Sequence, residues 1–390
     1  MQNSFKMNGE SEMKEYNRFQ IKNCIFTILI VGILALVVVS PVHAKNSAFS
    51  SLSLTGQRAV IMDMDSGKIL YKKNPNVHCH NASTTKLATA IVAVEQNKSL
   101  KKKIRISGNA SGVGSSSDTV KLGMSTGDSY YLEDLLHAML LKSANDTSVA
   151  IAEGTSGSEA RFMKQVNKKM KKIGCKNTVF GSSNGLRSSN THYTTAKDLA
   201  LIMRYAYKND TIRSIMKKKS YSFKSIGGRY HTVSNTNALL SSKDYYCIGK
   251  TGNGWTAKYC YTGVYTYKGH SYVIVTLGNA TDGGKWSDAK KMIAACKKHA
   301  KSVQKSLALN QTKAEITVDS TIKLKVRKIN AAVKWTSKDK KIATVDENGK
   351  VTGKRAGTVT ICAKVYGKTL KCKVKVVEDN TTETIEAVTE

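Results

Sequence analysis

The chain is poor in proline, with only Pro41 and Pro75 among its 390 residues. This scarcity excludes a proline-rich spacer between folded parts. The length nevertheless exceeds that of one ordinary domain and predicts two or three. A hydrophobic content of 41% and a charged content of 23% are typical of globular domains with sizeable cores.

Acidic residues are also scarce, because 28 Asp and Glu stand against 62 Lys and Arg, giving a net charge of +34. Lysine clusters at Lys101–Lys103, Lys168–Lys172 and Lys217–Lys219 have no aromatic residues between them, which argues against a nucleic-acid surface. Each cluster alone is best interpreted as a solvated helix face. The total charge predicts attraction to polyanions, either an anionic wall polymer or a membrane surface.

Cysteines are too few and too scattered for a disulfide framework. Seven of the eight lie beyond the N-terminal segment: Cys79, Cys175, Cys247, Cys260, Cys296, Cys362 and Cys372. Cys362 and Cys372 flank one expected turn, and Cys247 and Cys260 flank another. Either pair could form a bond or remain two free thiols.

Metal-ligand spacing is missing as well. His78-Cys79-His80 has no partner ligand nearby at the spacing of a zinc site, and three consecutive residues rarely converge on one ion. We therefore expect neither a metal nor another cofactor.

The chain has no apolar run of the roughly 20 residues that span a bilayer comfortably. The longest run, Ile25–Val39, has 15 residues, follows Lys14, Arg18 and Lys22, and ends shortly before Val42-His43-Ala44. This pattern predicts a signal peptide over residues 1–44, with an uncleaved anchor as the alternative. Both interpretations predict export. Residues 1–44 carry four basic and three acidic side chains, so the remainder carries +33.

Alternating strands and periodic helices follow one another through residues 45–306. Strands are predicted at Arg58–Asp63, Ile69–Lys72, Tyr245–Lys250, Tyr259–Tyr267 and Ser271–Gly278. Helices are predicted from Ser83 onward and at Leu132–Leu141, Val149–Glu153, Ser158–Ile173, Lys197–Tyr207 and Trp286 to about Ser306. This order predicts an α+β fold with an antiparallel sheet rather than repeated βαβ units.

Residues 307–377 change character. About seven short alternating strands alternate with turn residues such as Asn348-Gly349 and Gly367, which predicts a small all-β sandwich. Residues 378–390 reverse the sign of charge and lack aromatics, so we expect an acidic disordered tail.

A first candidate for chemistry is Ser83-Thr84-Thr85-Lys86 at the start of an amphipathic helix. At positions i and i+3 the hydroxyl and the amine lie on one helical face. A lysine can take the proton of a serine if its surroundings disfavour the ammonium form. The motif alone is weak evidence, because S-x-x-K recurs at Ser99 and at five later serines.

Two further motifs make the assignment specific. Ser143-Ala144-Asn145 follows at a boundary between helices, and Lys250-Thr251-Gly252 occurs once, on an expected strand. S-x-x-K, S-x-N and K-T-G in this order are the motif set of β-lactamases and penicillin-binding proteins.

The stretch from about Arg58 to Ala300 resembles the low-molecular-weight D-alanyl-D-alanine carboxypeptidases, a family of penicillin-binding serine D,D-peptidases. The matching segments are RAVIMDMDSGKILYKKN, ASTTK, LLHAMLLKSANDTSVAIAEGTSGS, SSNGL, HYTTAKDLALIMRYA and GKTG. Residues 307–377 resemble a bacterial Ig-like domain of group 2 through VKWTSKDKKIATVDENGKVTGKRAGTVTI. The resemblance implies a β-lactamase/transpeptidase-like fold for residues 45–306.

The resemblance also implies roles by position. Ser83 would attack the penultimate D-Ala carbonyl of a peptidoglycan stem peptide, and penicillin would acylate the same hydroxyl. Lys86 would be the general base, Ser143 would relay a proton, and Asn145 would orient Lys86. Lys250 and Thr251 would bind the substrate carboxylate, and Gly252 would leave room for the substrate. The backbone N–H groups of Ser83 and Asn253 would form the oxyanion hole.

Some positions depart from the family pattern. Asn81 stands two residues before the nucleophile where the family usually has proline. Asn253-Gly254-Trp255 replaces an aromatic or His followed by Thr, and Lys258 replaces a glycine. These changes concern rate and substrate preference more than reaction class. His192 is interpreted as a satisfied helix-capping histidine.

Three alternatives remain. No E-x-x-L-N-type segment lies between Asn145 and Lys250, which argues against a class A β-lactamase. A D,D-endopeptidase is not separated from a carboxypeptidase by sequence. A non-catalytic wall-binding protein would leave the intact motifs unexplained. We expect a secreted or extracytoplasmic enzyme at the cell wall or the outer face of the membrane.

Overall fold

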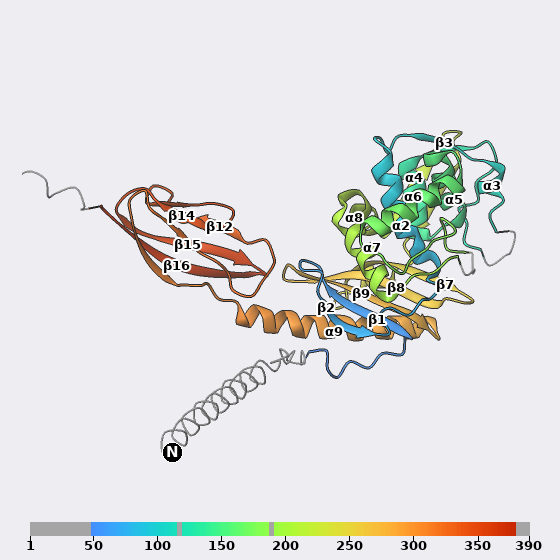
Figure 1. Cartoon of the computed structure of the whole chain (residues 1–390). Helices are drawn as coiled ribbons and strands as arrows, with labels where there is room; N and C mark the ends of the chain where they lie inside the picture. Colours follow the sequence, from blue (N-terminus) through green and yellow to red (C-terminus); the bar gives the residue numbers. More distant parts are fainter. Residues whose placement is uncertain (1–47, 115–118, 187–190, 380–390) are drawn as a thin grey trace, which may run out of the picture. The chain divides into compact units, whose positions relative to one another are not determined.

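The computed structural model describes residues 48–114, 119–186 and 191–379 (Figure 1). The predicted signal peptide and most of the predicted acidic tail lie outside these residues. Among the helices in the described ranges, none is long and apolar enough to cross a membrane.

A five-stranded antiparallel sheet organises the first part of the chain. Its order is β2-β1-β9-β8-β7, so β7 lies at one edge. The strands are β1 (Arg58–Asp63), β2 (Ile69–Lys73), β7 (Cys247–Gly254), β8 (Lys258–Tyr267) and β9 (His270–Asn279). Lys268 and Gly269 both have positive φ, 49° and 83°, as a tight turn between twisted strands requires.

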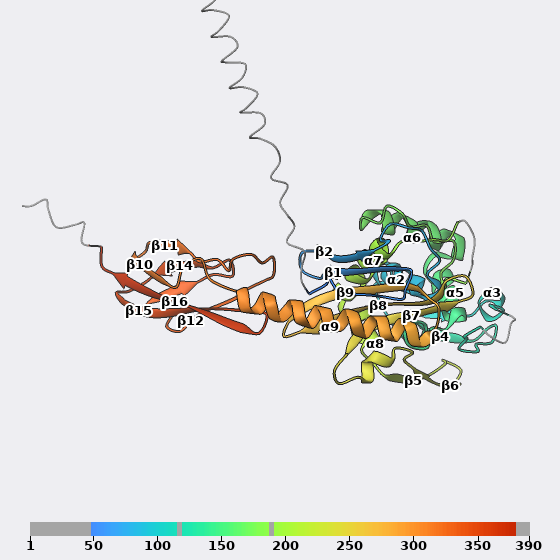
Figure 2. The same cartoon turned by 90° about the horizontal axis from the view of Figure 1, so that it is seen from below.

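Helices cover both faces of this sheet. On one face lies the cluster α2 (Lys86–Gln96), α4 (Leu132–His137), α5 (Asn145–Ser156), α6 (Glu159–Lys172), α7 (Ala196–Lys208) and α8 (Asp210–Met216). On the other face lies α9 (Asp282–Ser306), which runs along β8 and β9 (Figure 2). One apolar core joins the helical cluster to the inner face of the sheet. The predicted α+β fold is therefore confirmed.

The helix ends follow local capping rules. The Thr195 side chain accepts a hydrogen bond from the Asp198 N–H and so caps the start of α7. Gly174 follows the end of α6 with φ 96°, a conformation that glycine adopts readily. The predicted helix at Leu132–Leu141 is instead divided, because α4 continues into a π-helical turn, η2 (Ala138–Lys142).

Several short elements were not predicted, because three to seven residues carry little periodicity. They are β3 (Lys103–Arg105), α3 (Gly108–Ser111), β4 (Ser129–Tyr131), β5 (Ser220–Lys224), β6 (Tyr230–Ser234) and the 3-10 helix η3 (Ala238–Ser241), besides α8. The helix predicted from Ser83 begins as a 3-10 turn, η1 (Ala82–Thr85), and continues as α2. The strands β3 with β4 and β5 with β6 form two separate antiparallel pairs.

The C-terminal part consists of seven strands in two sheets, as predicted. One sheet has the order β10-β16-β15-β12 and the other β11-β14-β13. The strands are β10 (Lys313–Thr317), β11 (Thr321–Lys323), β12 (Lys334–Ser337), β13 (Ala343–Val345), β14 (Lys350–Gly353), β15 (Gly357–Val365) and β16 (Lys368–Val377). Buried residues of both sheets, such as Val351 and Ile361, share one apolar core.

All seven cysteines in the described ranges are free thiols. Cys247 pairs with Tyr265 across β7 and β8, whereas Cys260 pairs with Gly252, so the two thiols are five residues apart along the ladder. Cys362 lies opposite Lys371 rather than opposite Cys372. The strand register therefore explains why neither considered pair is bonded.

Candidate active site

The candidate nucleophile Ser83 lies in η1, directly before helix α2. The preceding Ala82 adopts φ 45°, which is uncommon for a residue with a Cβ atom. Strained backbone of this kind is concentrated at functional sites, where the surrounding structure holds it in place. The turn brings Ser83 Oγ within 2.8 Å of Lys86 Nζ, the arrangement expected from S-x-x-K.

Lys86 is fully buried, and within the described residues it forms no ion pair with a carboxylate. Its Nζ atom contacts three neutral groups: Ser83 Oγ at 2.8 Å, Asn145 Oδ1 at 2.7 Å and the Asn184 carbonyl oxygen at 2.9 Å. Burial, reinforced by the charge of Lys250 and only partly opposed by Asp146, holds the pKa of Lys86 well below its usual value. A neutral amine donates two hydrogen bonds and keeps one lone pair. The oxygens of Asn145 and Asn184 can accept the two N–H bonds, and the Ser83 hydroxyl can donate to the lone pair.

The second motif, Ser143-Ala144-Asn145, contacts Lys86 through Asn145 and Lys250 through Ser143. Ser143 follows the π-helical turn η2 and has φ 69°; turns of this type are frequent at functional sites. Its Oγ accepts a hydrogen bond from Lys250 Nζ at 2.8 Å. Asn145 begins α5, and its Nδ2 donates to the Val120 carbonyl at 3.0 Å. That bond orients the amide so that Oδ1 faces Lys86.

The third motif lies on β7, the edge strand. Lys250 is buried, and burial together with the nearby charge of Lys285 lowers its pKa to about 7. Thr251 Oγ1 lies 2.8 Å from Thr236 Oγ1. Among the described strands, β7 pairs with β8 alone, so no strand covers its other edge, and an extended peptide can bind there as an added strand.

Gly252 brings the strand and the nucleophile turn close together. A Cβ atom at this position would lie 2.6 Å from the Asn81 carbonyl oxygen and 3.2 Å from the Thr84 nitrogen. The resemblance implied that this glycine makes room for the substrate. The contacts give a further reason, because a side chain here would push β7 away from Ser83.

Lys285 is a residue that sequence reasoning did not find. It lies in the first turn of α9, is 2% exposed, and donates to Asn253 Oδ1 at 3.0 Å. It also forms an ion pair with Asp282. The sequence does not single it out, because Lys285 is one of many lysines in α9. Its bond to Asn253 links the first turn of α9 to the end of the substrate strand.

His192 was wrongly interpreted as a helix cap, since Thr195 caps α7. The ring is fully buried, accepts the Gly181 N–H at Nδ1 (3.2 Å), and places Nε2 3.1 Å from Thr85 Oγ1. Burial lowers its pKa to about 4. Asn81, also buried, donates from Nδ2 to both Thr84 and Thr85. These bonds hold Thr84 and Thr85 of η1, the turn that carries Ser83, in place.

The arrangement thus joins a serine hydroxyl, a lysine whose environment favours the neutral amine, a second buried lysine and an open strand edge. These parts can form and hydrolyse an ester on serine with a peptide that ends in a carboxylate. Among the described residues, no three His, Cys, Asp or Glu side chains are grouped so as to hold a metal ion.

Comparison with known families identifies two regions. Residues 44–281 match the family described as D-alanyl-D-alanine carboxypeptidase, and residues 303–384 match the bacterial Ig-like domain of group 2. The first match spans more than half of the chain.

Individual relatives agree with the first match. The chain is 30% identical to a D-alanyl-D-alanine carboxypeptidase, DacF, of Bacillus subtilis over 275 residues, which is 69% of each protein. It is 31% identical to the D-alanyl-D-alanine carboxypeptidase of Streptomyces sp. strain K15, covering 60% of this chain and 84% of that one. The crystal structure of the Streptomyces K15 DD-transpeptidase matches with a TM-score of 0.59 at 29% identity, over 63% of this chain and 98% of that chain.

Proposed function

Because the chain belongs to the D-alanyl-D-alanine carboxypeptidase family, we propose that it removes the terminal D-Ala of stem peptides through an acyl-enzyme on Ser83. The protein is a serine-type peptidase that acts on peptidoglycan. Family membership implies peptidoglycan peptides as substrates, binding of β-lactams, and a site of action at the cell wall, outside the cytoplasm.

Acylation begins on Ser83. Its Oγ attacks the carbonyl carbon of the penultimate D-Ala while the hydroxyl proton moves to the neutral Lys86 amine, 2.8 Å away. The C–N bond then breaks. The leaving amine of D-Ala takes a proton through Ser143, whose Oγ lies 2.8 Å from Lys250 Nζ. An ester on Ser83 and free D-Ala result.

The strand edge holds the substrate during this step. Lys250 and Thr251 bind the terminal carboxylate, and the backbone N–H groups of Ser83 and Asn253 bind the developing oxyanion. Lys285 donates to Asn253 Oδ1 and is paired with Asp282, so it holds the Asn253 side chain in place at the end of the strand. Water then hydrolyses the ester, with Lys86 again accepting the proton. A penicilloyl ester on Ser83 persists, because no deacylating glutamate of the class A type occurs between Asn145 and Lys250.

The observation that carries this proposal is the set of three neutral contacts around the buried Lys86 amine. The experiment that tests it is the release of D-Ala from an acetylated peptide ending in D-Ala-D-Ala. The matched controls are Ser83→Ala and Ser99→Ala, since Ser99 belongs to another S-x-x-K copy and is exposed. Loss of release in Ser83→Ala alone supports the assignment; equal rates in all three proteins would contradict it.

Three product assays separate the related activities. Release of D-Ala with water as acceptor defines a carboxypeptidase. Transfer of the acyl group to an added amine defines a transpeptidase, and cleavage of a cross-linked dimer defines an endopeptidase. We propose that the first reaction dominates. A non-catalytic wall-binding protein would show none of the three.

We also propose that residues 1–44 direct export and are removed. The folded parts would then be a D,D-peptidase domain of residues 45–306 and an Ig-like domain of residues 307–377. N-terminal sequencing of the exported protein tests the cleavage, and a first residue other than Lys45 would move the boundary.

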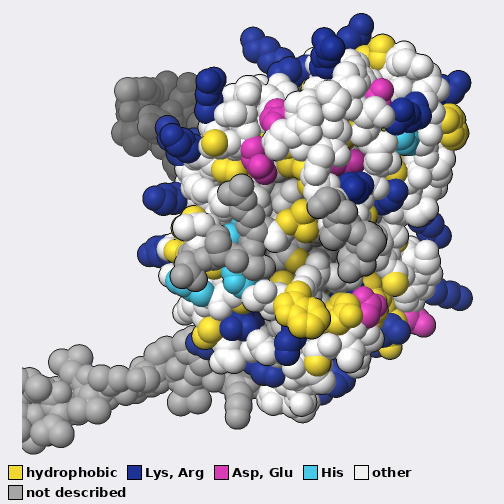
Figure 3. All heavy atoms as spheres, turned by 90° about the vertical axis from the view of Figure 1, so that its right-hand side faces the viewer, with side chains coloured by type: hydrophobic (Ala, Val, Ile, Leu, Met, Phe, Trp, Pro, Cys, Tyr) yellow, Lys and Arg dark blue, Asp and Glu magenta, His cyan; other side chains and the backbone are white. Residues whose placement is uncertain are grey.

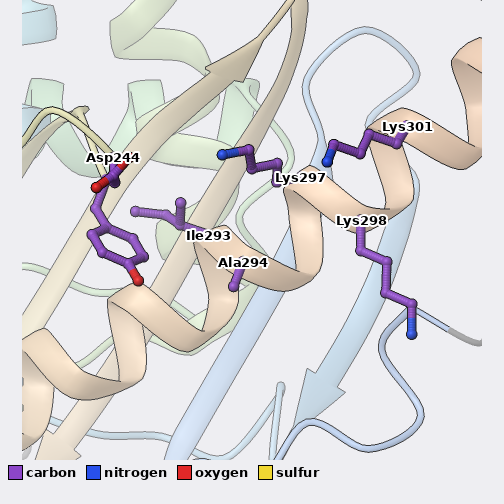
Figure 4. Close-up of a pocket in the computed structure, with 7 residues that line it drawn as sticks. Asp244, Ile293, Ala294, Lys297, Lys298 and Lys301 are labelled. Atoms are coloured by element: carbon purple, nitrogen blue, oxygen red, sulfur yellow. The ribbon is translucent and has the colours of Figure 1, made fainter.

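An anionic wall polymer is the partner that the charge favours. Lys and Arg side chains surround the face in Figure 3, where acidic side chains are few. On α9, the outward face carries Lys290, Lys291, Lys297, Lys298, Lys301 and Lys305. Three of these lysines line a hollow of about 330 Å³ together with Asp244 and Tyr245, and Lys298 points away from the other two (Figure 4). The apolar face of α9 is buried, so the helix cannot insert into a membrane by that face.

Charge reversal tests this partner. Replacing Lys297, Lys298 and Lys301 by Glu should abolish salt-dependent binding to a glycerol phosphate polymer. The same change at Lys168, Lys171 and Lys172 on α6, which are all exposed, should weaken it only slightly. Equal losses would mean that net charge alone matters, and binding to anionic vesicles instead of the polymer would favour a membrane surface.

A further inference from the structure

The Ig-like part has one sheet surface that is strongly basic. In the sheet β10-β16-β15-β12, Cys372, Val374 and Val376 of β16 are buried in the core, so the residues between them face solvent. Residues directly opposite each other in paired strands lie on the same face of a sheet. The register therefore places six exposed lysines on the outer face, which we call the basic face: Lys313, Lys334, Lys364, Lys371, Lys373 and Lys375.

The charges on the basic face are poorly balanced. Two pairs of lysines lie directly opposite each other, Lys313 with Lys373 and Lys334 with Lys364. Like charges in such positions destabilise a sheet. Among the described strand residues of this face, Glu315 is the one acidic side chain, and its carboxylate lies 3.1 Å from Lys375 Nζ. The face therefore favours a partner that supplies further negative charge.

The basic face is hollowed near the end of β16. The hollow has a volume of about 480 Å³ and is lined by Lys313, Ala314, Glu315, Thr358, Lys373 and Lys375. Thr358 lies opposite Lys375, and β16 ends two residues later at Val377. Three ammonium groups and a hydroxyl around one hollow are suited to bind carboxylates.

Carboxylates are concentrated in the sequence directly after this strand. Residues 378–390 contain five of the 28 Asp and Glu side chains of the chain and no Lys or Arg, whereas residues 307–377 contain 17 basic and five acidic side chains. The eleven residues after Asp379 can extend over about 36 Å. The distance along β16 from Lys375 to Lys371 is only about 13 Å. Residues 380–390 are therefore long enough to turn at the end of β16 and pass back over the basic face.

We propose that residues 380–390 bind the basic face of the same chain through Glu383, Glu386 and Glu390. The bound segment covers the lysines of β16 and keeps other polyanions away from the Ig-like part. The lysines of α9 then remain the surface for a wall polymer. A single exposed ion pair is weak, but the short tether gives the segment an effective concentration in the millimolar range.

Carbodiimide cross-linking of the full-length protein tests this contact, because the reagent joins a carboxylate directly to a neighbouring amine. Cross-linked peptides should join Glu383 or Glu386 to Lys371 or Lys373. The yield should fall at least about fivefold in 1 M salt, where charges are screened within about 3 Å. In a mixture of isotopically labelled and unlabelled protein, the joined peptides should come from one chain. Cross-links mainly between two copies, or mainly to the lysines of α9, would overturn the proposal.

The rate of lysine acetylation gives a second measurement. The matched variant carries Glu383→Gln, Glu386→Gln and Glu390→Gln, which remove the charge, keep the length and lie beyond the last strand of the Ig-like part. At low salt, acetylation of Lys371 and Lys373 should be about threefold faster in this variant, because their amines are uncovered. Exposed lysines on α6, such as Lys168, should react at the same rate in both proteins. Equal rates at Lys371 and Lys373 in both proteins would contradict the contact.

Polymer binding tests whether the segment masks the basic face. Starting from the protein with Lys297, Lys298 and Lys301 replaced by Glu, the same three glutamine substitutions should restore salt-dependent binding to a glycerol phosphate polymer. No restored binding would overturn the masking role. Release of D-Ala from a D-Ala-D-Ala peptide should be the same in all these proteins, so the result is independent of the proposed peptidase activity.

Discussion

Replacing Asn145 by aspartate would put a carboxylate where an amide oxygen now lies 2.7 Å from Lys86 Nζ. The two side chains have nearly the same shape, so the change is chiefly one of charge. At this separation, an effective dielectric constant of about 20 gives an attraction of about 6 kcal/mol between carboxylate and ammonium. The Lys86 pKa should therefore rise, because the charged form gains a partner that it now lacks.

Even a third of that energy is enough to affect catalysis. About 2 kcal/mol in favour of the ammonium form lowers the population of neutral Lys86 roughly 30-fold. We expect the acylation of Ser83 by penicillin at pH 7.5 to slow by at least that factor. The loss should shrink as the pH is raised, because deprotonation restores the base.

Asn145→Ala is the control, since it removes the same hydrogen bond without adding charge. It should slow acylation without moving the pH dependence to higher pH. Stopped-flow acylation rates between pH 6 and pH 10 separate the two variants. If Asn145→Asp acylates within threefold of wild type, with an unchanged pH profile, neutral Lys86 is not the base.

Three further predictions concern the second lysine, pH stability and the thiols. Lys250→Gln should lower kcat/KM for a D-Ala-D-Ala peptide roughly 30-fold, because a charged hydrogen bond is lost. Since deprotonation of Lys250 near pH 7 should lower the wild-type kcat/KM as the pH rises, the variant should not show this decline. A decline that persists in the variant would mean that another group causes it. His192 has a pKa of about 4 when folded and about 6.5 when unfolded, so only the unfolded state binds its proton between these values. Stability should therefore fall by up to about 3 kcal/mol as the pH drops from 6.5 to 4, and urea unfolding of His192→Gln should show a smaller fall. Because the described cysteines are free, a reducing agent should leave the melting temperature unchanged, and a drop of several degrees would indicate a disulfide.

Much of the fold could be predicted from periodicity. The alternating pattern of Arg58–Asp63 predicts a strand, and these residues form β1. The C-terminal part likewise has seven strands, separated by the turns that the sequence indicated. The three motifs could likewise be predicted to converge, because each occurs on a characteristic element. In the structure Lys86 contacts Asn145, and Lys250 contacts Ser143 of the same motif.

The remainder depends on contacts that no local pattern encodes. The burial of Lys285 against Asn253 comes from the packing of α9 on the sheet, and its sequence neighbours do not reveal it. The left-handed conformations of Ala82 and Ser143 are equally invisible, since neither residue type favours positive φ. His192 was misassigned because its partner, Thr85, is 107 positions away along the chain.

The most direct test of the central claim is to label the full-length protein with a fluorescent penicillin and locate the adduct by peptide mass spectrometry. The account predicts one stable adduct, on Ser83, that is absent from Ser83→Ala and present in Ser99→Ala. An adduct on another serine, or no adduct on folded protein that still releases D-Ala, would contradict the assignment of Ser83 as the nucleophile.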